Sequence, residues 1–239
     1  MRFFLLLVVA NCLSINCISQ TCVIAKITYR KNDTSIIIGS DTKFGNYIYN
    51  ATTGIYDTVY THGHKIYNKG QITYVTIGYG AEIQRRLADS VLNLHLSAYE
   101  TLTLYVNRFE RIMDDDLNEL KKTSPSLYKK IVTENTSLVS STMFAFFDHH
   151  YPTLCHLLFV KTLFGITTQW HNGNMAAGGE LQVIQSKLGD EKTWSVGAVT
   201  AIKSMLKAEA IDRPDKVSLP FDFIIIHKNK VEQFSYQKY

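Results

Sequence analysis

The order of the strand-like and helix-like segments is the feature of this sequence that most constrains its fold. Alternating apolar residues between polar turns predict strands in three separate groups. The first group is at residues 21–29, 36–41, 64–67 and 71–78, the second at 139–147, 153–160 and 164–170, and the third at 221–227 and 231–236. Apolar residues at helical spacing predict helices at residues 83–98, 104–122 and 195–210, with a further helix that opens at residues 178–180. Residues 44–63 are expected to form a loop. Segregated runs of strands and helices favour sheets covered by helices on their outer faces, so we expect an α+β layered sandwich rather than a doubly wound fold.

The composition is that of one globular domain. The chain has 239 residues, of which 46% are hydrophobic and 19% are charged, and this length allows a well-buried core. Its formal net charge of +4 is small, and its basic residues are scattered along the sequence. Proteins that bind nucleic acid usually concentrate basic residues on one face. We therefore expect no nucleic-acid partner.

Residues 1–20 have the layout of a cleaved secretory leader. Arg2 gives a positive start, residues 3–10 are an unbroken apolar run, and residues 11–20 are small and polar. The apolar run is too short to cross a bilayer and no later segment is apolar enough, so we expect no membrane partner. Three glycosylation sequons agree with a secreted or secretory-pathway glycoprotein, and their asparagines are Asn32, Asn50 and Asn135. The expected parts of the chain are a leader, residues 1–20, and one domain, residues 21–239.

The position of the cut decides which residue begins the secreted chain. Small residues at Cys17 and Ser19 favour cleavage before Gln20, whereas Ser19 and Thr21 would allow cleavage before Cys22. A chain that begins at Thr21 therefore needs a second step that trims Gln20. In such a chain, one residue carries both a hydroxyl and a free α-amine. An α-amine with a pKa of roughly 8 is a base that can activate the hydroxyl near neutral pH.

Six short segments follow one another in a recognisable order. They are Thr21-Cys22-Val23-Ile24-Ala25, Ile37-Ile38-Gly39-Ser40-Asp41, Gly45-Asn46-Tyr47-Ile48, His64-Lys65-Ile66, Thr76-Ile77-Gly78-Tyr79-Gly80-Ala81 and Asp215-Lys216-Val217-Ser218. In this order they resemble the β-type subunits of the proteasome, which belong to the N-terminal nucleophile (Ntn) hydrolases. The resemblance covers most of residues 21–239 and is carried by the positions of the motifs. It implies a four-layer αββα sandwich.

The resemblance also implies a role for each matching residue. Thr21 would be the nucleophile, with Lys65 beside its hydroxyl and Asp41 holding the lysine. A cation at that point lowers the pKa of the hydroxyl and of the amine and stabilises the developing charge. Asp215 and Ser218 would orient the α-amine. Backbone N–H groups that stabilise the oxyanion would come from the turn of Gly78, Tyr79 and Gly80.

The function that the resemblance implies is that of a secreted threonine-type endopeptidase, a hydrolase that works through an acyl-enzyme on Thr21. Two alternatives stay open. One is an inactive, secreted proteasome-like protein with a binding or structural role, and the other is an Ntn amidase that uses Cys22. The family also implies assembly into a homo- or hetero-oligomeric ring, although the stretch at residues 104–137 could cover the ring-forming surfaces and leave a monomer.

Several features depart from the family's pattern. The turn at residues 30–35 and the loop before Lys65 are longer than the family norm. Tyr79 stands where the family has a glycine, and Gly178 stands where it has a serine. The family is intracellular, whereas this chain begins with a secretory leader.

The residues that match the family's primary specificity pocket are mostly apolar or aromatic. They are Phe44, Gly63, Tyr67, Ile77 and Ala81, with Arg85 at the rim. No carboxylate among them could pair with a basic side chain of a substrate, and burying an unpaired charge costs on the order of a few kcal/mol. We therefore expect cleavage of peptide or protein substrates after small to medium apolar residues.

Cysteine and histidine spacing favours no cofactor. Outside the leader the cysteines are Cys22 and Cys155, so one disulfide is possible and their pairing is left open. Histidines cluster at residues 62–64 and 149–156 without carboxylate or cysteine partners at ligand spacing, and we expect no metal and no other cofactor. The acidic run at residues 114–116 is expected to be a solvated face.

Overall fold

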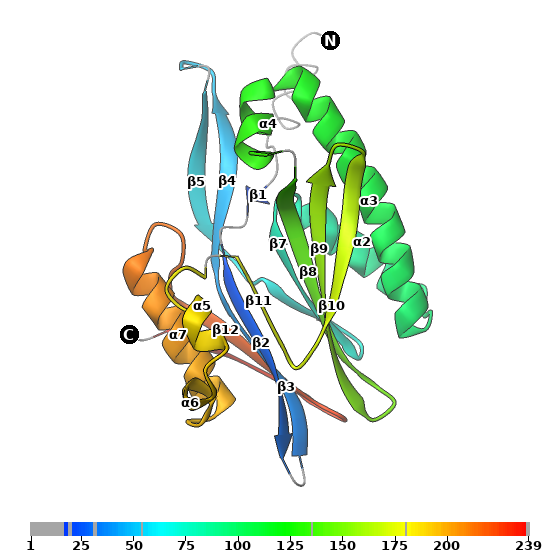
Figure 1. The fold of residues 1–239 in the computed structure, drawn as a ribbon, viewed down its shortest axis with the longest axis vertical. Coiled ribbons are helices and arrows are strands. Elements are labelled where there is room, and N and C mark those ends of the chain that lie inside the picture. The colour runs from blue at the N-terminus through cyan, green and yellow to red at the C-terminus, as the bar shows by residue number, and fades with distance from the viewer. Residues whose placement is uncertain are drawn as a thin grey trace, which may run out of the picture.

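The computed structural model describes residues 17–18, 21–30, 33–53, 55–134, 136–179 and 181–237. Apart from Cys17 and Ile18, the predicted leader lies outside these residues, as do the sequon asparagines Asn32 and Asn135. Within them the chain forms a mixed α/β fold with several antiparallel sheets (Figure 1). The predicted combination of sheets and helices is therefore confirmed.

The first five-stranded sheet carries the predicted nucleophile. Its strands lie in the order β11-β2-β3-β12-β13, with bounds Met175–Gly179, Cys22–Arg30, Asp33–Asp41, Phe221–His227 and Val231–Tyr236. β2 and β3 form a hairpin in which Val23 lies opposite Ser40, so the end of β3 returns to the start of β2. The helix predicted to open at residues 178–180 is wrong for its described part, because Gly178 and Gly179 end β11 and pair with β2.

The second five-stranded sheet packs against the first, with an apolar cluster between them. Its strands have the order β10-β9-β8-β7-β6, with bounds Gly165–Asn172, Tyr151–Thr162, Ser137–Asp148, Ile72–Gly78 and Ile66–Lys69. All of its neighbouring strands are antiparallel. β7 ends at Gly78, where a short turn leads into the helices.

Residues 43–62 form a long hairpin, and the predicted loop at 44–63 is wrong. β4 (Lys43–Asn50) and β5 (Ile55–His62) pair over their whole length, and the short β1 (Cys17–Ile18) adds to the free edge of β4. The hairpin projects from the rest of the molecule at the upper left of Figure 1. Its Tyr and Thr residues favour strands without the apolar alternation that marks a half-buried strand.

Helices cover the outer faces of the two larger sheets. They are α2 (Ala81–Leu92), α3 (Ala98–Thr123) and α4 (Pro125–Ile131) on one side, and α5 (Gln185–Leu188), α6 (Glu191–Trp194) and α7 (Ala198–Asp212) on the other (Figure 1). α3 begins at a capping box, in which the Ser97 hydroxyl accepts from the Glu100 N–H and the Glu100 carboxylate accepts from the Ser97 N–H.

Strand alternation divides the apolar residues into three clusters. Along β2, Cys22 and Ile24 pack with α7, whereas Val23 and Ala25 pack with residues of the second sheet. A third cluster lies between the second sheet and α2, α3 and α4. Gly39 lets α7 approach β3 closely, because an added Cβ there would lie 2.4 Å from Ile202 Cγ2. Thr21 precedes Cys22 and so shares the inner side of β2 with Val23.

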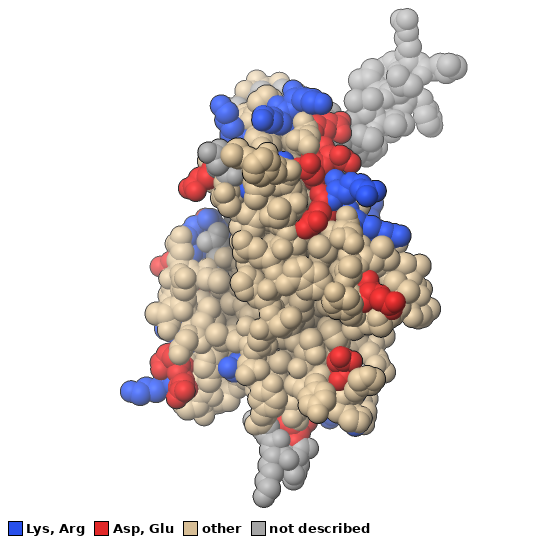
Figure 2. All heavy atoms as spheres, turned by 45° about the vertical axis from the view of Figure 1, so that its right-hand side comes forward, with Lys and Arg blue, Asp and Glu red and all other residues tan. Residues whose placement is uncertain are grey.

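The acidic run at residues 114–116 is not simply a solvated face. The Asp114 carboxylate pairs with Lys161 on β9, 2.6 Å away, and the Asp116 carboxylate accepts a hydrogen bond from the Tyr79 hydroxyl at 2.7 Å. These contacts join α3 to the second sheet. On the face drawn in Figure 2, basic and acidic side chains are interspersed and separated by large uncharged areas.

Candidate active site

Thr21 lies directly before β2 and is fully buried. Its hydroxyl donates a hydrogen bond to Asp41 Oδ1, with 2.6 Å between the two oxygens, and accepts one from the Lys65 ammonium. An ammonium that donates to a hydroxyl oxygen favours the negative charge that develops when the proton leaves. The hydroxyl is thus held in the environment that an oxygen nucleophile needs.

Asp41, the last residue of β3, is held by backbone groups as well as by side chains. Its Oδ1 accepts from the Cys22 N–H at 2.9 Å, and its Oδ2 accepts from the Lys43 N–H at 3.0 Å. Lys65 Nζ lies 2.9 Å from Oδ1. A fully buried carboxylate loses its hydration, and these donors compensate for that loss.

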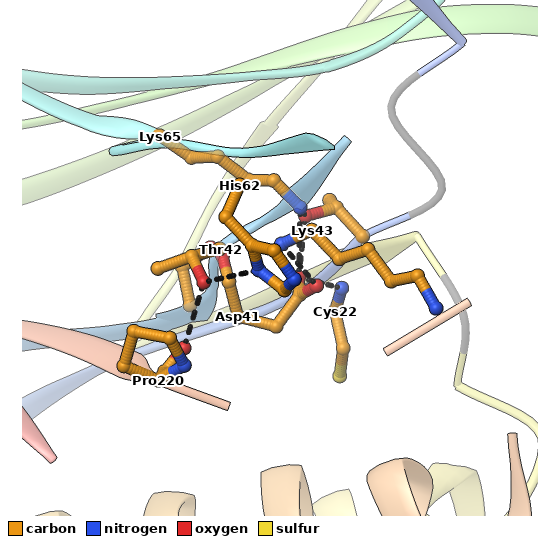
Figure 3. A network of polar contacts seen from close by, with 9 residues as sticks. Cys22, Asp41, Thr42, Lys43, His62, Lys65 and Pro220 are labelled. Atoms are coloured by element: carbon orange, nitrogen blue, oxygen red, sulfur yellow. Dashed lines mark hydrogen bonds and ion pairs between the residues drawn. The ribbon is translucent and has the colours of Figure 1, made fainter. Parts of the chain in front are cut away.

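Lys65 lies directly before β6 and is only 1% exposed. Its ammonium reaches the Asp41 carboxylate and also lies over the Phe44 ring, 4.9 Å from the ring centre. Figure 3 shows Lys65 and Asp41 converging from different segments of the chain on one network. Truncating one member of such a buried pair leaves the other charge unpaired, which makes the pair interdependent.

The Cys22 thiol points away from this network. Figure 3 shows the Cys22 nitrogen directed to Asp41 and its sulfur directed to the other side. The sulfur belongs to the apolar cluster between the first sheet and α7, whereas Cys155 belongs to the cluster under α3. The two cysteines are buried in these separate clusters on opposite sides of the fold, so their positions exclude a disulfide between them. Burial raises the pKa of the Cys155 thiol to about 11.

Gly179 fixes the position of the Thr21 main chain, and sequence reasoning missed it. Gly179 pairs with Cys22 and has φ of 88°, a left-handed conformation that favours glycine. An added Cβ would lie 1.6 Å from the Thr21 carbonyl oxygen. The Gly178-Gly179 pair is the sequence signal that could have predicted this close approach.

The turn predicted to bind an oxyanion has the glycine conformations of a tight turn. Gly78 has φ of 89° and Gly80 has φ of 71°. Between them, the Tyr79 N–H donates to the Val139 carbonyl at 2.9 Å, so this donor is already engaged. The Tyr79 side chain is buried and points to Asp116.

Asp215 and Ser218 lie between α7 and β12, and no described contact joins either residue to Thr21. The Asp215 carboxylate is 61% exposed and lies 3.8 Å from Arg213 Nε. Ser218 Oγ is buried and has no hydrogen-bond partner among the described residues. The structure therefore brings Thr21, Asp41 and Lys65 together, and within the described part of the chain no hydrogen bond or ion pair links them to Asp215 or Ser218.

Four of the five predicted pocket residues line one cavity of about 320 Å³. They are Phe44, Gly63, Tyr67 and Ala81, and the wall also contains Asn46, Thr61, His62, His64, Thr76 and Glu82. Ile77 lines a different cavity. Arg85 is paired with Glu82 and Asp89, at 2.7 Å and 3.2 Å. Its guanidinium lies over Tyr67, 5.6 Å from the ring centre.

Two of the clustered histidines, which were expected to bind no metal, are part of the surroundings of the site. The Nδ1 atom of His64 lies 2.6 Å from the buried carboxylate of Asp222, and His62 Nδ1 lies 3.3 Å from the Thr42 hydroxyl. Among the described residues, no group of three or more His, Cys, Asp or Glu side chains is arranged to hold a metal ion. The same residues contain no helix that is both long enough and apolar enough to cross a membrane.

Comparison with known proteins adds no family assignment. No protein-family description matches the chain, and no curated protein matches it in sequence.

Proposed function

We propose that this protein is a threonine-type Ntn hydrolase and acts as a secreted endopeptidase, with Thr21 as its nucleophile. The observation that carries the proposal is the buried contact of the Thr21 hydroxyl with both Lys65 and Asp41. These residues are separated by 20 and 24 positions along the chain, and three different segments bring them together. A buried lysine whose ammonium contacts both a hydroxyl and a carboxylate can activate that hydroxyl as an oxygen nucleophile, because the positive charge stabilises the developing alkoxide.

The arrangement of sheets and helices supports the proposal. α7 packs on the first sheet, α2 and α3 pack on the second, and an apolar cluster fills the space between the sheets. This is the order of layers expected of the four-layer αββα sandwich that the motifs imply. The fold and the motifs thus favour the same family, although they are different kinds of observation.

The base in the proposed reaction is the α-amine of Thr21. In the uncut chain this nitrogen is an amide and is not basic, so the reaction requires a cut directly before Thr21. The free amine accepts the proton of the hydroxyl as Oγ bonds to the carbonyl carbon of the substrate. Lys65 stabilises the charge on Oγ, and Asp41 keeps the ammonium in place.

The remaining steps use the same groups. The C–N bond of the substrate breaks, the leaving nitrogen takes the proton from the α-ammonium, and an ester on Thr21 remains. Water then attacks this ester while the amine accepts the proton from water. Breakdown of the second intermediate returns that proton to Thr21 Oγ and releases the carboxylic acid.

The segment ahead of Thr21 supports a peptide substrate. β1 pairs with the edge of β4, with Cys17 opposite Asn46 and Ile18 opposite Gly45. Asn46 and its neighbour Phe44 line the 320 Å³ cavity. An extended peptide that adds to the same edge has its backbone satisfied by β4 and its side chains next to that cavity.

A second candidate is an inactive binding or structural protein of the same fold. The engaged Tyr79 N–H, the exposed Asp215 and the unpartnered Ser218 favour it, because they are the groups that would complete the reaction centre. Cys22 as nucleophile is disfavoured by the direction of its sulfur.

The deciding experiment begins with the amino-terminal residue of the secreted protein. Sequencing is expected to give Thr21, and incubation with an activated peptide ester is expected to add one acyl mass that Thr21→Ala abolishes. Lys65→Ala should lose acylation, whereas Lys161→Ala, which removes another lysine with a carboxylate partner, should retain it. Gln20 or Cys22 as the first residue would rule out the Thr21 mechanism.

Assembly into a ring is a further consequence of the proposed family. Size-exclusion chromatography with light scattering measures it directly. A single species near the mass of one chain, which is 27.2 kDa with its leader, would contradict the ring.

A further inference from the structure

A second cavity, of about 580 Å³, begins beside the nucleophile. Gly179 forms part of its wall, and the Gly179 backbone packs against the Thr21 carbonyl. Gly78, at the end of β7, forms another part. The wall is largely apolar, and its apolar members include Ile77, Val139, Leu158, Ala177 and Leu181.

Two buried polar atoms in this wall have no partner. Within the described part of the chain, His156 Nε2 and Ser140 Oγ make no hydrogen bond, although their residues are only 8% and 3% exposed. Buried polar groups are nearly always hydrogen-bonded, and leaving one unpaired is costly. Two such atoms on one cavity indicate a ligand that pairs with both.

The imidazole of His156 is neutral near pH 7. Burial, with a smaller effect from His171, lowers the pKa of His156 to about 4. A neutral imidazole nitrogen either accepts or donates one hydrogen bond, and the Ser140 hydroxyl can do both. An uncharged group that carries both a donor and an acceptor can therefore pair with both atoms, whichever ring nitrogen of His156 holds the proton.

Gly178 keeps the space in front of His156 open. An added Cβ at this position would lie 3.6 Å from His156 Nε2 and 2.8 Å from Ile77 Cδ1. Any side chain at residue 178 would thus point to the unpartnered nitrogen and fill part of the cavity. The glycine leaves that volume for something else.

The direction of the chain at Thr21 indicates which part of a substrate reaches this cavity. Residues 17–18 approach Thr21 along β4, past the cavity that contains Phe44 and Asn46. A peptide on the same path places its acyl half there. Its leaving half then lies on the other side of the scissile bond, and the second cavity begins next to Thr21, where Gly179 lies beside the Thr21 carbonyl.

We propose that this second cavity binds the side chain of the residue that follows the scissile bond and selects a carboxamide, Gln or Asn, through His156 and Ser140. The proposal rests on the peptidase function proposed above. A carboxamide offers both a donor and an acceptor, so it can satisfy both atoms. An apolar side chain leaves both unpaired, and a carboxylate has no proton to donate. A basic side chain would meet the ammonium of Lys130, which lines the same cavity and donates to the Tyr56 carbonyl at 3.2 Å.

The test compares peptides that differ only in the residue after the cut, with Gln, Asn, Leu, Glu or Lys at that place. We expect kcat/KM to be about tenfold or more higher for Gln than for Leu, as for other buried polar groups that need a partner. His156→Phe should bring this ratio close to one, and His156→Gln should restore part of it. Gly178→Ser should also lower the ratio, because its hydroxyl lies within reach of Nε2.

The control is His227→Phe, which removes an imidazole paired with Asp33 outside the cavity and should keep the ratio. Equal rates for Gln and Leu in the unchanged protein would overturn the proposal, as would a preference for Glu or Lys. If His156→Phe instead changed the preference for the residue before the cut, that result would also overturn the proposal.

A binding measurement separates this proposal from the proposed function. Tripeptides Gln-Ala-Gly and Leu-Ala-Gly, which represent leaving halves, are titrated into the protein while the ring signals of His156 are followed by NMR. Tighter binding of the Gln peptide with shifted His156 signals supports the cavity assignment even if no peptide is cleaved. Cleavage without any response of His156 supports the peptidase and refutes the cavity assignment.

Discussion

Replacing Lys65 with Met tests whether the buried ion pair holds the candidate site together. The substitution keeps a long apolar stem and removes the ammonium. Asp41 is then a fully buried carboxylate that retains the Cys22 and Lys43 N–H donors and the Thr21 hydroxyl. Truncating one partner of a buried pair costs about 3–5 kcal/mol, and the remaining donors favour the lower end, about 3 kcal/mol. For a domain of this size, that lowers Tm by about 10 °C.

Asp41→Asn is the reciprocal change, because it leaves the Lys65 ammonium buried beside a neutral amide. We expect a loss of stability similar to that of Lys65→Met. The double variant removes both charges, so its loss should be smaller than the sum of the two single losses by about 2 kcal/mol or more. All three variants should lose acylation of Thr21, since each removes a group that contacts the nucleophile or its lysine.

The assay is urea unfolding of the secreted protein and the three variants, with the Lys161–Asp114 pair as a matched control. The side chains of that pair are 11% and 34% exposed. A double-mutant cycle on it should therefore give an interaction energy of about 1 kcal/mol or less. Strictly additive losses for Lys65 and Asp41 would refute the reasoning, because additivity means that the two charges do not depend on each other.

Three further predictions concern other parts of the fold. Gly179→Ala should destabilise the protein by about 2 kcal/mol or more and abolish acylation of Thr21, since the added Cβ meets the Thr21 carbonyl. Gly189→Ala is the control, because an added Cβ there has nothing within 4 Å, and it should leave both stability and acylation unchanged. A thermal melt and the acylation assay measure the two properties. Burial depresses the pKa of His156 from 6.5 to about 4, so the unfolded chain binds a proton at this residue more readily than the folded one. The stabilisation of the fold by the neutral His156 is therefore fully present above pH 6.5 and is lost as the pH falls to about 4. His156→Phe should flatten that part of the stability-versus-pH curve, and an unchanged slope would contradict the burial argument. Cys22 and Cys155 should resist a thiol reagent in the folded protein and both react after unfolding; a mass consistent with a disulfide would contradict this.

The sequence by itself determined the apolar strands. The apolar segments at residues 21–29 and 36–41 predicted two strands, and these form as β2 and β3, a hairpin that returns Asp41 to Thr21 and is buried on both faces. The apolar spacing from Ile83 likewise predicted a helix, although α2 ends at Leu92 and Ala98 already belongs to α3. Such patterns are local, because the apolar residues that define each element are close together in the sequence.

Only the tertiary structure decided the elements without that local signal. The Tyr- and Thr-rich hairpin β4–β5 exposes much of its surface, so no alternation marked it. Gly178 and Gly179 belong to a strand because the Thr21 backbone must pass closely beside them. The directions of the Cys22 sulfur and of His156 Nε2 depend on which layer packs on each face. Contacts between segments far apart in the chain set these features, and no short stretch of residues encodes such contacts.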